Sequence, residues 1–102
     1  MKPADHAQWR ADKMRKTTLF ESSKMLVVLN GFEPGQSHAL HAHAGTDKLY
    51  YVIEGEGVLL LDDRELAMRA GDVLVAPDGV PHGVRNTGQE RLLVLAVLAP
   101  AP

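Results

Sequence analysis

The sequence contains no cysteine, and this absence excludes disulfide bonds, thiolate catalysis and thiolate metal ligands. It also lacks a long apolar run: the longest, residues 92–100, is far shorter than the roughly 20 residues that a membrane-spanning helix needs. An excess of basic residues is missing as well, because 11 Lys and Arg stand against 13 Asp and Glu. We therefore expect neither a membrane partner nor a nucleic-acid partner. Residues 1–16 lack the apolar segment of a secretory signal peptide, so we expect a cytoplasmic protein.

The sequence has, instead, a rhythm of short apolar runs separated by turn signals such as Pro34-Gly35 and Pro77-Asp78-Gly79. No stretch has a convincing helical pattern. Nine runs in 102 residues predict one all-β domain, a sandwich or a barrel. The last run is apolar throughout, which predicts a strand buried on both faces. The predicted strands cover residues 17–20, 24–32, 38–43, 48–53, 58–61, 64–68, 73–75, 82–85 and 92–98.

The chain divides into an N-terminal arm, residues 1–16, and a barrel domain, residues 17–102. The arm carries Trp9 and Met14. Two arrangements are open: these side chains dock on the same domain, or the arm crosses to a second subunit. Because a small β domain exposes edge strands that a two-fold contact would hide, we expect a homodimer.

Three of the five histidines have the spacing of a metal site. His41 and His43 are two residues apart in a predicted strand, so both imidazoles lie on one face, with Cα atoms about 7 Å apart along the strand. His82, at the start of another predicted strand, is the candidate third ligand. Three imidazoles with open positions suit Fe, Ni, Zn, Mn or Cu, and the identity stays open. Simple alternation places His38 on the opposite face, at the surface.

Glycines flank the first two histidines at fixed distances. After Gly35 come five residues and His41-Ala42-His43. Four residues then precede Lys48, and six more precede Gly55.

A second set of glycine, proline, histidine and asparagine residues also has fixed spacings. After Gly71 come five residues, then Pro77-Asp78-Gly79, two residues, His82, three residues and Asn86. The two sets resemble the two signature motifs of the cupin superfamily. The second matches at every specified position, and the first departs at one. The resemblance implies a single jelly-roll barrel, also called a double-stranded β-helix, that binds one divalent transition metal.

The departure is Lys48, which stands where the superfamily usually has a glutamate that is a fourth metal ligand. An ammonium is a poor neighbour for a dication. Three interpretations are open. Lys48 turns away to pair with Glu54 or Glu56; or a bulge makes Asp47 the ligand; or metal binding is weakened and Lys48 anchors an anionic ligand.

Other residues are candidates for the ligand pocket. Tyr50 shares the face of Lys48, where its hydroxyl either bonds a backbone group or donates to a substrate oxygen as a catalytic or binding group. Val52 and Val84 are candidates for the apolar wall. Neutral histidines leave a bound dication with its full charge, which favours a small anionic ligand.

Two functions follow from this set of residues. The first is a metalloenzyme acting on a small organic acid or phenol. A dioxygenase-like reaction is favoured over isomerisation or decarboxylation, by analogy with cupins of this layout. The second is a non-catalytic module that senses or stores a small ligand and holds a structural metal.

Overall fold

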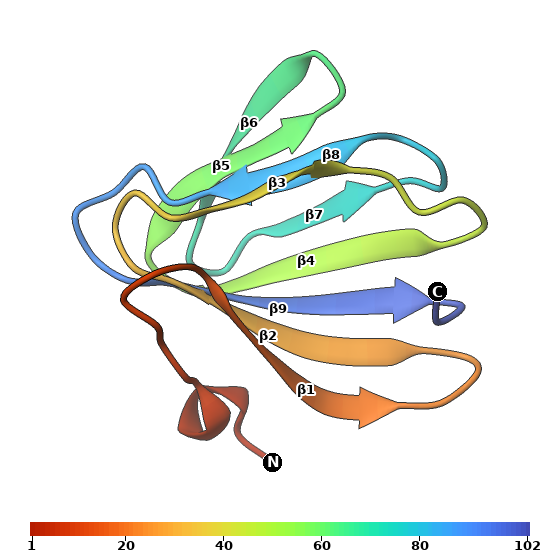
Figure 1. Cartoon of the computed structure of the whole chain (residues 1–102), viewed down its shortest axis with the longest axis horizontal. Coiled ribbons are helices and arrows are strands. Elements are labelled where there is room, and N and C mark those ends of the chain that lie inside the picture. The colour runs from red at the N-terminus through yellow and green to blue at the C-terminus, as the bar shows by residue number, and fades with distance from the viewer.

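The computed structural model describes all 102 residues and contains nine β-strands and one short 3-10 helix (Figure 1). Each of the nine predicted runs falls on one strand, which confirms the all-β prediction. No helix in the structure is long and apolar enough to cross a membrane. The elements are η1 (Pro3–His6), β1 (Arg15–Glu21), β2 (Leu26–Phe32), β3 (Ser37–His41), β4 (Asp47–Glu54), β5 (Glu56–Leu61), β6 (Arg64–Arg69), β7 (Val73–Ala76), β8 (His82–Arg85) and β9 (Leu92–Ala99).

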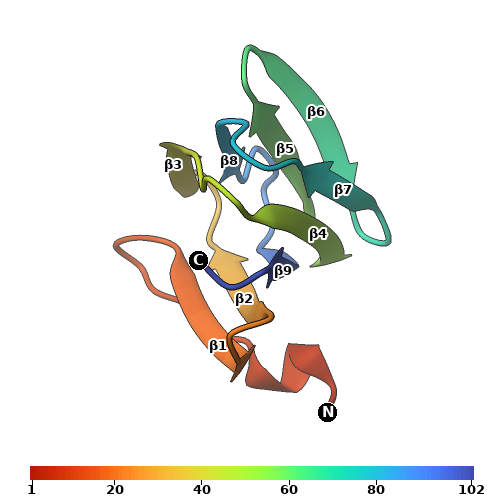
Figure 2. The same ribbon diagram turned by 90° about the vertical axis from the view of Figure 1, so that its right-hand side faces the viewer.

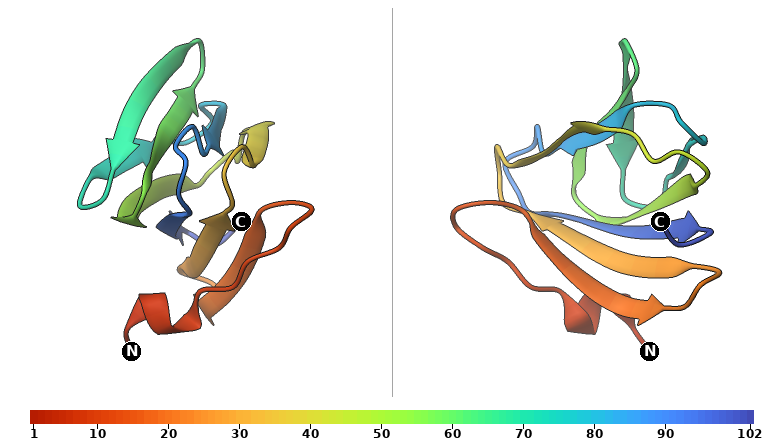
Figure 3. Two further views of the ribbon diagram at one scale, coloured as in Figure 1. Left: turned by 90° about the vertical axis from the view of Figure 1, so that its left-hand side faces the viewer. Right: turned by 45° about the vertical axis from the view of Figure 1, so that its right-hand side comes forward.

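The strands form two antiparallel sheets that face each other (Figures 2 and 3). The five-stranded sheet has the order β1-β2-β9-β4-β7, and the four-stranded sheet has the order β3-β8-β5-β6. Strands that are distant in sequence are therefore neighbours, as where β9 lies between β2 and β4. This is the predicted jelly-roll barrel, or double-stranded β-helix.

The core lies between the inner faces of the two sheets. Along β4, burial alternates with a period of two: Lys48, Tyr50 and Val52 are buried, whereas Leu49 and Tyr51 are exposed. The core is a single cluster of 13 buried residues that draws on both sheets. Because Lys48 lies on the inner face of β4, its ammonium is carried into the barrel, and no charged partner accompanies it.

The N-terminal arm docks on its own chain. The Trp9 ring lies against β2 at Gly31, where an added Cβ would be only 3.0 Å from a ring carbon. The Arg91 guanidinium lies 4.6 Å from the Trp9 ring centroid, a cation–π contact. Met14 packs against the core. β1 begins at Arg15, so the first strand starts two residues earlier than expected.

The prediction that the last strand is buried on both faces is correct only for its first part. Residues 92–94 of β9 are buried, whereas Leu95 and Val97 on its outer face are half-buried. The arm accounts for part of this burial, because Trp9 covers Gly31, the cross-strand partner of Leu93. On β9 itself, Leu95 and Val97 lie beyond that contact and stay partly accessible.

Candidate metal centre

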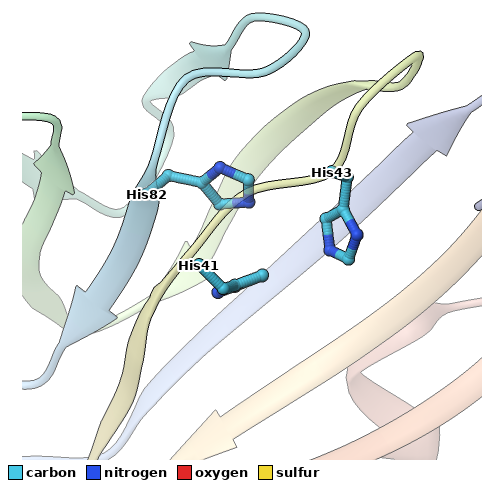
Figure 4. Close-up of side chains that lie close together, drawn as sticks. All are labelled: His41, His43 and His82. Atoms are coloured by element: carbon cyan, nitrogen blue, oxygen red, sulfur yellow. The ribbon is translucent and has the colours of Figure 1, made fainter.

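The pairing of β3 with β8 brings three histidines together (Figure 4). His41, the last residue of β3, is the cross-strand partner of His82, the first residue of β8. His43 lies two residues beyond the end of β3, so the predicted strand over 38–43 is shorter than expected. One ring nitrogen from each of the three lies within 4.8 Å of the others. Cross-strand register, as well as the i, i+2 spacing, therefore assembles the group.

Backbone carbonyls orient two of the three rings. The Nδ1–H of His41 donates to the carbonyl oxygen of Ala39 (2.8 Å), and the Nδ1–H of His82 donates to that of Val80 (2.9 Å). A proton on Nδ1 leaves the lone pair on Nε2. Backbone acceptors of this kind commonly fix the tautomer and orientation of metal-binding histidines.

The donor set fits a divalent transition metal. His82 Nε2 is buried and has no hydrogen-bond partner, and such an orphaned acceptor is normally costly. Burial, above all other causes, lowers the pKa of both His43 and His82, which keeps these imidazoles in the neutral form that a metal requires. Zinc–imidazole bonds are about 2.0–2.1 Å long. Rotation of the rings would place all three nitrogens at that distance from one ion.

Asp47 and Lys48, the two alternatives at the fourth position, point to opposite faces of β4. Asp47 is exposed, and its carboxylate accepts a hydrogen bond from the backbone N–H of Asp78 (2.8 Å), so it lies outside the histidine group. Lys48 is only 4% exposed and forms no ion pair with Glu54 or Glu56. The interpretation in which Lys48 turns away to an acid is therefore wrong, because strand alternation directs it inward.

His38 does not lie at the surface as alternation suggested. The register between β3 and β8 shifts between His38 and His41, and this irregularity brings both rings to the same side. Their centroids are 4.4 Å apart. Burial, followed by the charges of His41 and Lys48, lowers the pKa of His38 to about 4, so its ring stays neutral.

A pocket of about 360 Å³ opens beside the histidines. Its walls come from both sheets. Its apolar lining is Met14, Leu26, Val28, Leu98 and Pro102; its polar lining is Lys16, Asn30, His38, His41, His43 and Lys48. No aspartate or glutamate lines it, so no acidic side chain in the lining offsets the positive charge of the two lysines.

The predicted wall residues lie deeper than the pocket. Tyr50, Val52 and Val84 belong to the buried core, and none of them lines the pocket. The Tyr50 hydroxyl is buried without a hydrogen-bond partner, so the expected bond to a backbone group is not made. Burial raises the pKa of the Tyr50 phenol, which keeps it protonated. Its ring centroid lies 6.3 Å from that of His82, so it packs beneath the histidine group.

The sequence did not single out Lys16, Asn30 and His38 as pocket residues. Lys16 and Asn30 are cross-strand partners on β1 and β2, and both line the pocket. The polar Asn30 within the apolar run 24–32 was a detectable signal, because a buried polar side chain in a strand usually has a partner or a role. The position of His38 had no comparable signal in the sequence.

Comparison with known proteins finds relatives that are similar to this chain in sequence. The oxalate-binding protein of Thermotoga maritima is 40% identical over 65 residues, which are 64% of this chain and 54% of that protein. The chain spans about half the length of the curated relatives that it matches.

Solved structures extend the comparison to the whole chain. A protein from Thermus thermophilus has a TM-score of 0.96 at 39% identity, with 100% of this chain and 97% of that chain covered. A predicted oxalate decarboxylase from T. maritima has a TM-score of 0.81 at 30% identity, with 86% and 81% covered. Residues 28–98, more than half of the chain, match the Cupin domain family. The chain therefore belongs to the cupin family.

Proposed function

We propose that His41, His43 and His82 hold one divalent transition metal, and that the pocket beside it binds a small organic anion. The observation that carries this proposal is the buried, unpartnered Nε2 of His82, which shares a cluster with the nitrogens of His41 and His43. A dication gives that orphaned acceptor a partner. The pocket supports the proposal of an anionic ligand, because lysines and histidines line it and aspartate and glutamate side chains do not.

The ligand class also has support from the relatives. One is an oxalate-binding protein and another a predicted oxalate decarboxylase, and we propose a small carboxylate ligand for this chain on that basis. A bound divalent metal would supply Lewis acidity to a coordinated carboxylate oxygen. His38, neutral and packed on His41, would form part of the wall against which the ligand lies.

Binding without turnover is the form of this function that we favour. Its support is the likeness to a relative that is named for binding oxalate. A dioxygenase-like reaction on a small organic acid or phenol is the second candidate, because three protein ligands leave coordination positions open for substrate and oxygen. For that reaction we propose the unpartnered Tyr50 hydroxyl as a hydrogen-bond donor after local movement.

Metal loading tests the proposal directly. Protein stripped with a chelator should take up close to one equivalent of Zn²⁺, Ni²⁺, Mn²⁺, Fe²⁺ or Cu²⁺. At 100 times the dissociation constant, binding stabilises the fold by about 2.7 kcal/mol. For a domain of this size, that corresponds to a rise in melting temperature of roughly 10–20 °C. Metal content by mass spectrometry and thermal melts would measure both quantities, and a chain that stays metal-free would refute the metal site.

Turnover is tested with the loaded protein and oxalate. A binding protein should show a further rise in melting temperature, while the concentrations of oxalate and dissolved oxygen stay constant. Loss of oxalate or oxygen would favour the enzyme.

We further propose that two copies associate through the outer face of the five-stranded sheet. Exposed Leu49 and Tyr51 of β4 are in register with exposed Val75 and Val73 of β7, and half-buried β9 residues adjoin them. These four side chains carry no charge, so the matching partner is also uncharged. A second copy offers the same apolar face, as two-fold contacts require.

The substitution Val73→Glu should therefore yield a monomer. Val73 is 57% exposed in the single chain, so the glutamate costs the monomer little, but in the contact it would bury an unpaired charge. Light scattering should give twice 11.1 kDa for the parent and 11.1 kDa for the variant. The control is Thr18→Glu, which places the same charge at an exposed position on β1 and should leave the mass of the dimer unchanged. A parent mass of 11.1 kDa would contradict the dimer.

A further inference from the structure

Lys48 is only 4% exposed as a residue, and its ammonium, which lines the pocket, has no ion-pair partner in the protein. All four ion pairs lie elsewhere: Arg10–Asp12, Arg69–Glu56, Arg85–Glu65 and Arg91–Glu33. Its Nζ lies over the face of the Tyr50 ring, 4.9 Å from the centroid. A buried charge without a counter-charge is among the costlier features that a fold retains.

The surroundings of Lys48 cannot supply the missing charge. Its neighbours across the sheet are Ala76 of β7 and Leu98 of β9, both apolar. The pocket that it lines has no aspartate or glutamate side chain, and the other lysine in the lining, Lys16, adds positive charge. Burial, followed by the charge of Lys16, lowers the pKa of Lys48 to about 8, so the ammonium is still the main form at pH 7. No acidic side chain of the pocket is therefore available as its counter-ion.

The second positive centre of the pocket would be the metal. Lys48 lies on the five-stranded sheet, whereas His41 and His82 lie on the opposite, four-stranded sheet. The pocket is bounded by both Lys48 and His41, so its two charged walls face the same space. A monoanion bound to the metal would leave the ammonium unpaired.

We propose that Lys48 is the second anchor of a dianionic ligand, so that the pocket selects short dicarboxylates over monocarboxylates. This inference rests on the proposed metal site. One carboxylate takes the metal on the histidine wall, and the other pairs with Lys48 on the opposite wall. Lys48 thus selects for a second negative charge, in the position where the family motif would place a carboxylate ligand to the metal.

Calorimetric titration of the zinc-loaded protein tests the proposal. Oxalate and malonate are the dianionic probes and acetate is the monoanionic probe, at pH 7 and low ionic strength, with protein-bound zinc measured before and after. Lys48→Met keeps the length of the side chain and removes the charge. It should weaken the dianions about 10–100-fold, as expected for a lost hydrogen bond to a charged group, and change acetate less than about 2-fold.

Two more variants separate this role from a structural one. Lys24→Met removes an exposed lysine in the β1–β2 turn and should leave every affinity unchanged. Lys48→Glu should abolish the preference for dianions while zinc uptake is retained or strengthened. Lys48→Met should also fold at least as stably as the parent, because it removes an unpaired buried charge.

The outcomes distinguish the two proposals. Zinc uptake with unchanged dianion affinity in Lys48→Met would overturn the Lys48 anchor alone. An equal loss for acetate and malonate would also overturn it, because the effect would then not depend on the second charge. Failure of the parent chain to take up zinc would overturn the metal site, and with it the two-point anchor.

Discussion

Replacing His82 with leucine should remove the stabilisation by metal while leaving the metal-free fold intact. Leucine has a side chain of comparable size that can fill the same space, and it lacks the buried Nε2 that has no partner. The lost hydrogen bond to Val80 costs about 1 kcal/mol, which the removal of the orphaned acceptor offsets. The metal-free melting temperature should therefore change little, whereas the metal-induced rise of roughly 10–20 °C should disappear.

Metal affinity should fall by more than the roughly 10–100-fold that the loss of an outer-shell partner costs, because a direct ligand is lost. Thermal melts with and without metal, together with equilibrium dialysis, would measure this. His6→Leu is the matched control, since His6 is exposed in η1 and far from the cluster in sequence. If His82→Leu kept the full metal-induced shift, the metal would have to be held elsewhere.

The substitution Gly55→Ala should destabilise the whole domain, by about 2–5 kcal/mol. Gly55 joins β4 to β5 with φ +85°, where an L-residue costs about 1–2 kcal/mol. A Cβ at this position would also overlap the carbonyl oxygen of Arg91 and lie 2.9 Å from the Cα of Leu92. Backbone cannot swing aside as a side chain can, so the overlap adds about 1–3 kcal/mol. A domain with about 5–15 kcal/mol in total would lose a large part of its stability.

Gly45→Ala separates the two causes. Gly45 has nearly the same φ, +84°, but an added Cβ would meet no atom within 4 Å. Gly45→Ala should therefore lower the free energy of unfolding only by the cost of the positive φ, about 1–2 kcal/mol. Urea unfolding of both variants would measure the difference. Equal losses would mean that β5 and the Arg91 segment separate at little cost.

The strands could be predicted because their signals are local. Pro77-Asp78-Gly79 and similar turns divide the chain, and alternation along residues 48–52 states which side chains enter the core. The three histidines could be predicted for the same reason: His41 and His43 are close in sequence, and the residues around His82 have the spacing of a cupin motif.

The position of His38 could not be predicted, because it depends on a register shift between two strands. Simple alternation is correct only while pairing is regular, and β3 is irregular between His38 and His41. Lys48 is a different case. Alternation with Tyr50 predicted that Lys48 faces inward, whereas the preference of a lysine for an acidic partner predicted that it turns outward. The structure follows the alternation. Asn30 could have been predicted as a pocket residue, because it is a polar side chain within an otherwise apolar strand sequence.

The division of the pocket between the two sheets has a consequence for divergence. His41 and His82 belong to one sheet, and Lys48 belongs to the other. A substitution at Lys48 can change which ligand is accepted while His41 and His82 keep their places on the other sheet, and a change on β3 can do the reverse. Two traits encoded on separate walls can therefore be selected one at a time, so the barrel can acquire a new ligand preference without passing through a form that has lost the proposed metal site.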